Sequence, residues 1–211
     1  MFSGDSMQTS DNREKEIKFF ISDPLQMHEH LLAHGARLQK ERLFEVNLRF
    51  DTSQQTLRAN RQVLRLRQDD HVRLTYKDQS EFSEGIADRR ELEITVSDFD
   101  TTRSILEALG FEVFMIYEKY RTTFTLDQCE IVIDEMPFGN FIEIEGPSAA
   151  AIRSVALLLA LDWGKRITAS YLDLFYKLKD QKKLSAPYLC FKYFKDLGFK
   201  EDDFTTGIDQ A

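Results

Sequence analysis

The stretch EKEIKFF, Glu14 to Phe20, places charged side chains at every second position, at Glu14, Glu16 and Lys18. Successive side chains of a β-strand point to opposite faces, so this spacing predicts a strand with one charged and one apolar face. If the charged face looks at water, the pattern is ordinary. If it looks inward, the strand offers carboxylates for a metal ion and a base for an anion.

The same alternation continues through the later predicted strands. Their charged rows are Arg65 and Arg67; Arg73, Thr75 and Lys77; Arg89, Glu91 and Glu93; Lys119, Arg121 and Thr123; Glu130 and Asp134; and Glu143 and Glu145. Side chains two apart on a strand lie ~7 Å apart on one face, so each strand offers a short charged row. The opposite faces are apolar, as at Leu64 and Leu66 or Ile142 and Ile144. Helices can cover these apolar faces.

Two arrangements are compatible with these rows. An open sheet could turn its charged face to water, which is common. Alternatively, the sheet closes and its lumen is charged. Two features favour closure. Acids dominate the first and last strands, whereas bases dominate the middle strands. Helices also interrupt the strands often enough to cover one whole face of the sheet. The connections at residues 69–70 and 136–140 are too short for parallel crossovers. The sequence therefore predicts an α+β fold, a closed eight-stranded antiparallel β-barrel (tunnel) with helices packed on its outside.

Helices are expected at residues 23–35, 97–110, 147–162 and 167–180, from their caps, apolar stripes and stop residues. Residues 51–60 form a connection or a short helical turn, and residues 78–88 a polar loop. A short amphipathic helix is also expected within residues 187–199. Its apolar stripe suits packing or a dimer contact and consists of Tyr188, Phe191, Phe194 and Leu197.

Composition limits the classes of function. The chain has 211 residues, with 28 basic against 36 acidic side chains and a net charge of −8, which argues against binding to nucleic acid or to anionic membranes. No apolar run approaches the ~20 residues that span a bilayer. Two distant cysteines, Cys129 and Cys190, predict neither a disulfide scaffold nor a zinc site. We therefore expect a cytoplasmic protein with a flexible tail at residues 1–12.

A lumen with both signs of charge has a clear chemical use. Arginine and lysine hold phosphate oxygens, and arginine does so with two parallel hydrogen bonds. Carboxylates hold Mg²⁺ or Mn²⁺, hard cations that also bridge to phosphates. The predicted ligand is therefore a polyphosphate together with divalent ions.

The order of the motifs is similar to that of the CYTH superfamily, also called triphosphate tunnel metalloenzymes. This superfamily contains class IV adenylyl cyclases, thiamine triphosphatases and inorganic triphosphatases. The resemblance spans about residues 14 to 176. The motifs that carry it are E-x-E-x-K at Glu14–Lys18, LRLR at Leu64–Arg67, LTYK at Leu74–Lys77, RRELE at Arg89–Glu93, EKYR at Glu118–Arg121, IVIDEM at Ile131–Met136 and GNFIEIEG at Gly139–Gly146.

The resemblance implies roles for individual residues. The implied metal ligands are Glu14, Glu16, Glu143 and Glu145, with Asp134 near a second metal or the water. The implied triphosphate contacts are Lys18, Arg65, Arg67, Lys77, Arg89, Lys119 and Arg121. The expected catalytic residues are Lys18, Glu91, Glu93 and Asp134. The closing helix of the family often supplies a further base, for which Lys165 and Arg166 are available.

The function expected from this resemblance is that of a divalent-metal-dependent triphosphatase acting on inorganic, thiamine or nucleoside triphosphate with Mg²⁺ or Mn²⁺. The alternatives are a class IV adenylyl cyclase, which converts ATP to cyclic AMP and pyrophosphate, and a non-catalytic module that binds polyphosphate or nucleotide. The stretch VNLRF, Val46 to Phe50, departs from the cyclase pattern of an Asp and an aromatic residue. We expect a tunnel domain over residues 13–178, a helical extension over 179–211, and a small-molecule triphosphate as partner; the resemblance makes a homodimer plausible.

Overall fold

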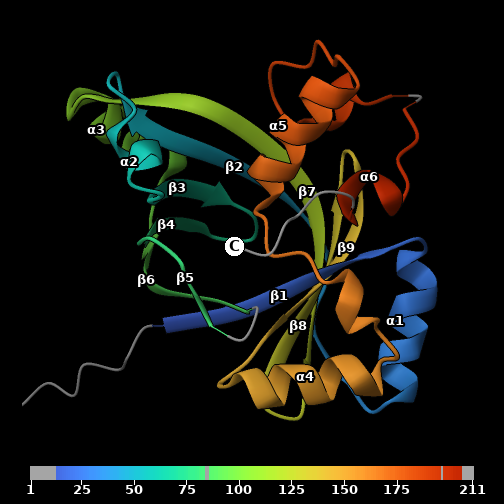
Figure 1. Ribbon diagram of the computed structural model, residues 1–211. Helices are drawn as coiled ribbons and strands as arrows, with labels where there is room; N and C mark the ends of the chain where they lie inside the picture. The colour runs from blue at the N-terminus through green and yellow to red at the C-terminus, as the bar shows by residue number, and fades with distance from the viewer. Residues whose placement is uncertain (1–12, 84–85, 196, 206–211) are drawn as a thin grey trace, which may run out of the picture.

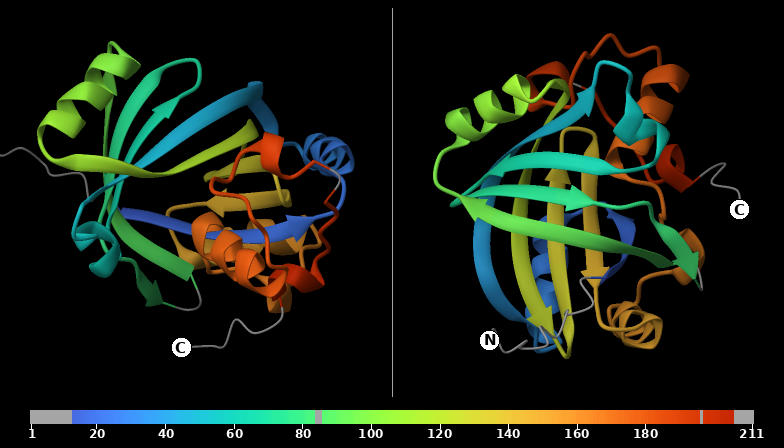
Figure 2. Two further views of the ribbon diagram at one scale, coloured as in Figure 1. Left: turned by 90° about the horizontal axis from the view of Figure 1, so that it is seen from above. Right: turned by 90° about the vertical axis from the view of Figure 1, so that its left-hand side faces the viewer.

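A single antiparallel sheet closes on itself at the centre of the protein (Figure 1). The computed structural model describes residues 13–83, 86–195 and 197–205. Eight strands follow the order β1-β9-β8-β7-β2-β3-β4-β6, and β6 pairs again with β1. Figure 2 (left) looks into the resulting ring. The closed eight-stranded antiparallel sheet predicted from the sequence is confirmed, with the short β5 added beside the start of β6.

The strands are β1 (Arg13–Ile21), β2 (Arg37–Thr52), β3 (Val63–Gln68), β4 (Val72–Lys77), β5 (Glu81–Ser83), β6 (Ile86–Val96), β7 (Phe111–Leu126), β8 (Cys129–Met136) and β9 (Gly139–Glu145). The helices are α1 (Pro24–Ala33), α2 (Thr56–Ala59), α3 (Phe99–Ala108), α4 (Ala149–Leu158), α5 (Tyr171–Gln181) and α6 (Asp202–Thr205), with single 3₁₀ turns at Trp163–Lys165 and Phe191–Tyr193. None of the helices in this described part combines the length and apolar character needed to cross a membrane.

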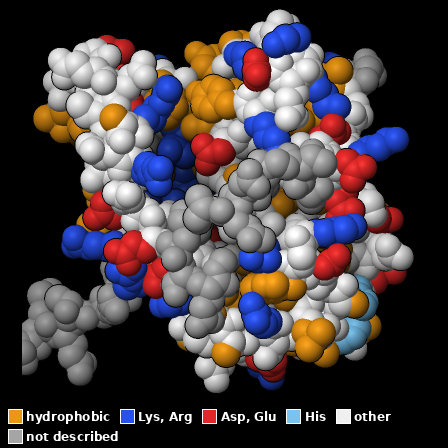
Figure 3. All heavy atoms as spheres, in the orientation of Figure 1, with side chains coloured by type: hydrophobic (Ala, Val, Ile, Leu, Met, Phe, Trp, Pro, Cys, Tyr) orange, Lys and Arg blue, Asp and Glu red, His pale blue; other side chains and the backbone are white. Residues whose placement is uncertain are grey.

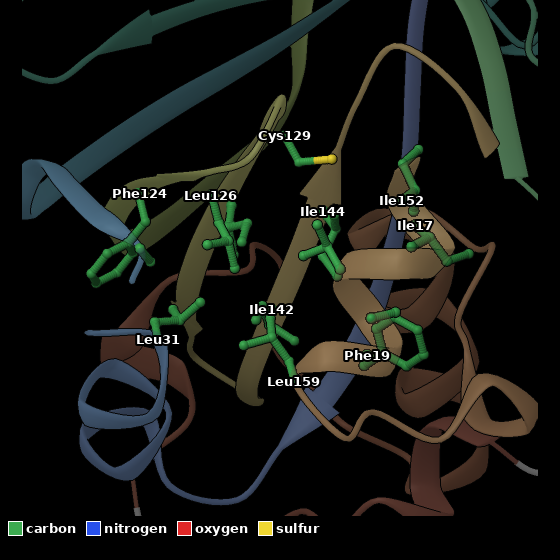
Figure 4. Close-up of a cluster of buried hydrophobic side chains, with 14 of the residues drawn as sticks. Ile17, Phe19, Leu31, Phe124, Leu126, Cys129, Ile142, Ile144, Ile152 and Leu159 are labelled. Atoms are coloured by element: carbon green, nitrogen blue, oxygen red, sulfur yellow. The ribbon is translucent and has the colours of Figure 1, made fainter. Parts of the chain in front are cut away.

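The outside of the ring is apolar where helices cover it. On β1 the charged row faces inward, whereas Ile17 and Phe19 face outward, and both are buried. They join outward side chains of β8 and β9, such as Ile142, in one cluster beneath α1 and α4 (Figure 4). Helix α1 begins where predicted, because the Asp23 carboxylate accepts hydrogen bonds from the first backbone amides of the helix.

One outward apolar row is not covered. Leu92 and Ile94 on β6 are 39% and 60% exposed. Helix α3 lies instead against β3 and β7. Helix cover is therefore complete over β1, β8 and β9 but not over β6. The predicted polar loop at residues 78–88 is also shorter than expected, because β6 begins at Ile86 and pairs at once with β1.

The C-terminal segment packs against one end of the ring. Inward side chains at this end are apolar rather than charged, as at Phe20 and Phe141. The fully buried Phe204 of α6 lies against both, with ring centroids 5.2 Å away in each case. Residues beyond 178, which the sequence suggested as an extension, thus share a core with the ring. The boundary proposed at residue 178 stays a prediction.

The prediction of an amphipathic helix within residues 187–199 is wrong. Leu189 instead forms a parallel bridge with β7, donating to the Ile116 carbonyl and accepting from the Glu118 amide. This backbone partner is available because β8 has ended there, and it holds the segment extended up to a single 3₁₀ turn. The packing role expected for the stripe is borne out at Phe194, which is buried, whereas Leu197 is 45% exposed.

Replacing Phe204 tests whether the C-terminal segment is part of the core. Phe204→Ala removes a fully buried ring that contacts Phe20 and Phe141. We expect it to lower the free energy of unfolding by about 3 kcal/mol, measured by urea denaturation. The control is Phe44→Ala, because Phe44 is 40% exposed and should cost less than about 1 kcal/mol. Equal losses for the two variants would contradict the packing described here.

Candidate active site in the ring

The charged rows meet in one cavity of about 760 Å³ inside the ring. Figure 3 shows Lys and Arg side chains gathered in the hollow between the side formed by α2, β3 and β4 and the side formed by α5. All but one of the residues predicted for the site line this cavity. They are Glu14, Glu16, Lys18, Arg65, Arg67, Lys77, Arg89, Glu91, Glu93, Lys119, Arg121, Glu143 and Glu145.

Closure of the ring between β1 and β6 creates the first group of ion pairs. Glu14 and Arg89 are cross-strand partners, and the Arg89 Nε lies 3.2 Å from a Glu14 oxygen. The buried Lys77 Nζ, from β4, lies 2.7 Å from Glu14 and 2.9 Å from Glu91. Lys77 and Glu91 are partners on the adjacent strands β4 and β6, whereas the contacts of Glu14 with Lys77 and Arg89 exist only because the sheet closes between β1 and β6.

Lys18 joins the acids of β1 and β9. Its ammonium is almost fully buried and lies 3.5 Å from Glu143 and 3.9 Å from Glu16. Burial alone would lower the pKa of Lys18, but the two carboxylates outweigh it and hold the pKa above its usual value. Lys18 is therefore charged at neutral pH.

Asp134 lies beneath the cavity surface and is completely buried. It accepts from Lys119 Nζ at 2.9 Å, from Arg121 Nε at 2.7 Å and from the Tyr171 hydroxyl at 3.0 Å. Burial would raise the pKa of this carboxyl, but Arg121 and Lys119 hold it below its usual range. In this structure Asp134 therefore holds two bases of the cavity wall in position. Its predicted roles in catalysis and metal binding stay predictions.

The two arginines of β3 contact acids of other strands, namely Glu93 of β6 and, for Arg67, also Glu45 of β2. Arg65 lies 3.6 Å from Glu93 and also donates to the Thr75 hydroxyl at 3.2 Å. Arg67 lies 3.4 Å from Glu93 and 3.8 Å from Glu45. A second hollow of about 450 Å³ shares Arg67, Glu93, Arg121 and Glu130 with the main cavity, so the two hollows meet at these side chains.

A row of carboxylates crosses three adjacent strands. Glu145 of β9 is the register partner of Glu16 on β1 and of Glu130 on β8. Within the described chain, Glu145 and Glu130 have no hydrogen bond or ion pair to a base, although Glu145 remains partly exposed to the cavity. Partial burial of the Glu145 carboxyl, together with the charges of Glu14, Glu130 and Glu16, raises its pKa to about 8.

The chemistry of this row suits a divalent cation, although among the described residues the three acidic or His ligand atoms that converge within 4.8 Å are those of Asp69, Asp70 and His71. Carboxylate oxygens are the ligands that Mg²⁺ and Mn²⁺ prefer, and a cation would relieve the repulsion that raises the pKa of Glu145. Glu16 and Glu145, with Glu14 and Glu143 beside them, are the residues that would hold it. Glu130 was not among the ligands predicted from the sequence.

Sequence reasoning missed three further side chains of the site. Glu45 is buried and lies 3.6 Å from Lys119. Arg49 lines the cavity from the same face of β2. Tyr171 of α5 donates to Asp134, and its ring lies 5.5 Å from the Lys18 ammonium. The alternation from Glu45 to Arg49 could have revealed the first two, whereas no sequence signal places α5 at the cavity.

The bases suggested for the closing helix lie elsewhere. Lys165 pairs with Glu201 at 2.8 Å, and Arg166 donates to the Trp163 carbonyl at 2.9 Å. Neither lines the cavity.

Comparisons with known proteins agree with this geometry. The model of the CYTH domain matches residues 12–153. A protein of Methanocaldococcus jannaschii named "putative adenylate cyclase" is 28% identical over 134 residues, which are 63% of this chain and 75% of that protein.

Two solved structures show the shared fold. A "putative adenylate cyclase" from Vibrio parahaemolyticus superposes with a TM-score of 0.68 at 21% identity, covering 77% of this chain and 97% of that one. A Hippeastrum protein, described as a "putative adenylyl cyclase" with a dominant triphosphatase activity, gives a TM-score of 0.56 at 18% identity over 77% and 95% of the two chains. Because the domain model spans well over half of the sequence, the chain belongs to the CYTH domain family.

Proposed function

We propose that the protein is a divalent-metal-dependent triphosphatase that hydrolyses a triphosphate inside the ring. The observation that carries this proposal is the division of the cavity. Bases from β1, β3, β4, β6 and β7 line it, next to the row formed by Glu16, Glu145 and Glu130. A phosphate chain needs the first group, and its divalent counter-ion needs the second.

The bases hold and orient the phosphate chain. Arg65 and Arg67 can present N–H donors to phosphate oxygens, and their carboxylate contacts keep them in place. Arg121 donates through Nε and Nη2 to Asp134 and Glu143, which leaves its Nη1 for a phosphate oxygen. Lys18 stands between the acid row and the bases, where it can neutralise charge on a transferring phosphoryl group. Bound Mg²⁺ or Mn²⁺ would supply further neutralisation of that charge.

Cyclisation of ATP is the rival reaction, and the names of two relatives favour it. A cyclase must also recognise adenine, whose amino group needs a hydrogen-bond acceptor. Asp173 is the acid that α5 contributes to the cavity lining, and its carboxylate already accepts from the amide and hydroxyl of Ser170. Both bonds go to the same oxygen, Oδ2, so the other oxygen of Asp173 does not decide between the two reactions. The Hippeastrum relative, described as a cyclase with dominant triphosphatase activity, supports hydrolysis.

A product assay with a Lys18 variant tests the reaction. With Mg²⁺ or Mn²⁺, we expect phosphate release from inorganic triphosphate, thiamine triphosphate or ATP, with cyclic AMP at most a minor product. Lys18→Gln should lower kcat/KM by about 100-fold, because it removes a charge next to the phosphoryl group. Lys15→Gln is the control, since Lys15 lies on the outer face of the same strand beside Asp88. Cyclic AMP as the main product, or binding without turnover of any triphosphate, would contradict the proposal.

Glu145→Gln tests the acid row as the metal site. The pKa of Glu145, about 8, lies above its ordinary value, so ionising Glu145 destabilises the folded state as pH rises towards 8. In EDTA the variant should melt at least about 2 °C above the parent at about pH 9 and close to it at about pH 5. Added Mg²⁺ or Mn²⁺ should raise the melting temperature of the parent more than that of the variant.

The matched control for this experiment is Glu112→Gln. Glu112 is an exposed glutamate of β7 that does not line the cavity. It should melt as the parent does at both pH values and gain equally from the metal. If Glu145→Gln behaves like this control, the row formed by Glu16, Glu145 and Glu130 is not the metal site.

A further inference from the structure

Three arginines at one mouth of the cavity differ from the other bases that line it. Arg49, Arg58 and Arg61 line this mouth, and within the described residues none of them makes an ion pair with a carboxylate. The predicted phosphate-binding bases, in contrast, each lie within 4 Å of at least one acid, as Lys77 and Arg67 show. These three guanidinium groups are therefore not committed to ion pairs as the inner bases are.

The guanidinium groups of Arg49 and Arg58 both lie near the ring of Phe114. They sit 5.9 and 4.9 Å from the centre of the same ring, that of Phe114. Arg58 also lies 6.0 Å from the ring of Tyr176 on α5, which places it across the mouth. The Nε of Arg49 is buried without a hydrogen-bond partner. An anion bound here would supply the acceptor that the buried Nε of Arg49 lacks.

The loop that carries Arg58 is fixed in advance. Asp51 is buried, and its carboxylate accepts from the amides of Thr52 at 2.8 Å, Leu57 at 2.9 Å and Arg58 at 3.0 Å. Arg61, at the end of the same loop, has a φ of 55°, a conformation that non-glycine residues rarely adopt. Such preorganisation lowers the entropy cost of holding a ligand.

The acids around the mouth are already engaged. Asp51 caps the loop, Asp78 accepts from the Gln62 side chain at 3.3 Å, and Asp173 accepts from Ser170. These donors are neutral, so the carboxylates keep their charge, but within the described residues none of the three forms an ion pair with Arg49, Arg58 or Arg61. Burial, together with repulsion from Arg65 and Arg89, lowers the pKa of Arg49 against the attraction of Tyr117 and Asp173.

We propose that Arg49, Arg58 and Arg61 form a subsite for a further phosphate group, so that the protein selects linear inorganic chains of four or more phosphates. This inference rests on the proposed function, because it takes the inner bases as the site of the first three phosphates. The same subsite disfavours thiamine triphosphate, whose thiazolium ring is cationic, since the mouth would repel it. Tyr176 and Phe114 form its apolar side and keep Arg58 in place.

Calorimetric titration of the full chain in EDTA, with inorganic triphosphate and tetraphosphate, tests the subsite without turnover. The parent should bind tetraphosphate about tenfold more tightly than triphosphate, as expected for one further charge-assisted contact. Arg58→Gln and Arg61→Asn should each remove about fivefold of this difference and leave triphosphate affinity unchanged within about twofold. Asparagine is chosen at 61 because it tolerates a positive φ.

Arg90→Gln is the matched control, because Arg90 is an exposed arginine of β6 that lies outside the cavity lining. Arg90→Gln should leave the preference for tetraphosphate over triphosphate unchanged. Arg58→Gln should also improve binding of thiamine triphosphate relative to triphosphate. Equal affinity of the parent for triphosphate and tetraphosphate would overturn the proposal. So would an Arg58→Gln variant that loses the same factor of affinity for triphosphate and for tetraphosphate. A larger loss for ATP than for tetraphosphate would assign the mouth to a nucleobase and overturn it too.

Because binding is measured without metal and without turnover, the two proposals fail separately. A preference for tetraphosphate that depends on Arg58 would stand even if no triphosphate were hydrolysed. Hydrolysis without that preference would leave the proposed function intact and remove the subsite.

Discussion

Charge compensation inside a closed sheet is the constraint on which the rest of the structure depends. Buried charges are tolerated only when opposite charges and hydrogen bonds surround them. Lys77 meets this condition because β4 and β1 flank β6, which sets its ammonium between Glu91 of β6 and Glu14 of β1. An open sheet would leave Glu14 without Arg89, its partner across the β1–β6 closure. Closing the ring and pairing the charges are therefore one and the same event.

The C-terminal segment takes part in this compensation, although it lies beyond residues 12–153, which the domain model matches. Tyr171 donates to the buried Asp134, whose other contacts hold Lys119 and Arg121. The centre of the Tyr171 ring also lies 5.7 Å from the Lys119 ammonium. Farther along, Phe204 fills the apolar end of the ring. The C-terminal segment thus has two roles. Tyr171 helps to position bases of the cavity, and Phe204 closes one end of the ring.

The period of two made the inner and outer faces predictable. Once Glu14 faces inward, the parity of β1 fixes every other side chain of that strand, and Ile17 is indeed buried outside the ring. What parity cannot give is the partner of each base, which depends on strand order. Nor could an amphipathic spacing reveal that Leu189 would find a free backbone partner on β7 and so extend rather than coil. Arg49 escaped notice because its row also carries Glu45 and Asn47 and shows no excess of one sign.

The separation of unpaired charge explains how a chain of net charge −8 can suit a polyanion. Within the described residues, the acids without an ion-paired base are Glu145 and Glu130, beside Glu16, whereas unpaired arginines lie at the mouth around Arg58. A bare phosphate chain would be attracted by the mouth and repelled by the acid row. A chain that carries a divalent cation would be attracted by both, because the cation meets the acids while free phosphate oxygens meet the arginines. The cavity is therefore complementary to a metal–polyphosphate complex, more than to either ion alone.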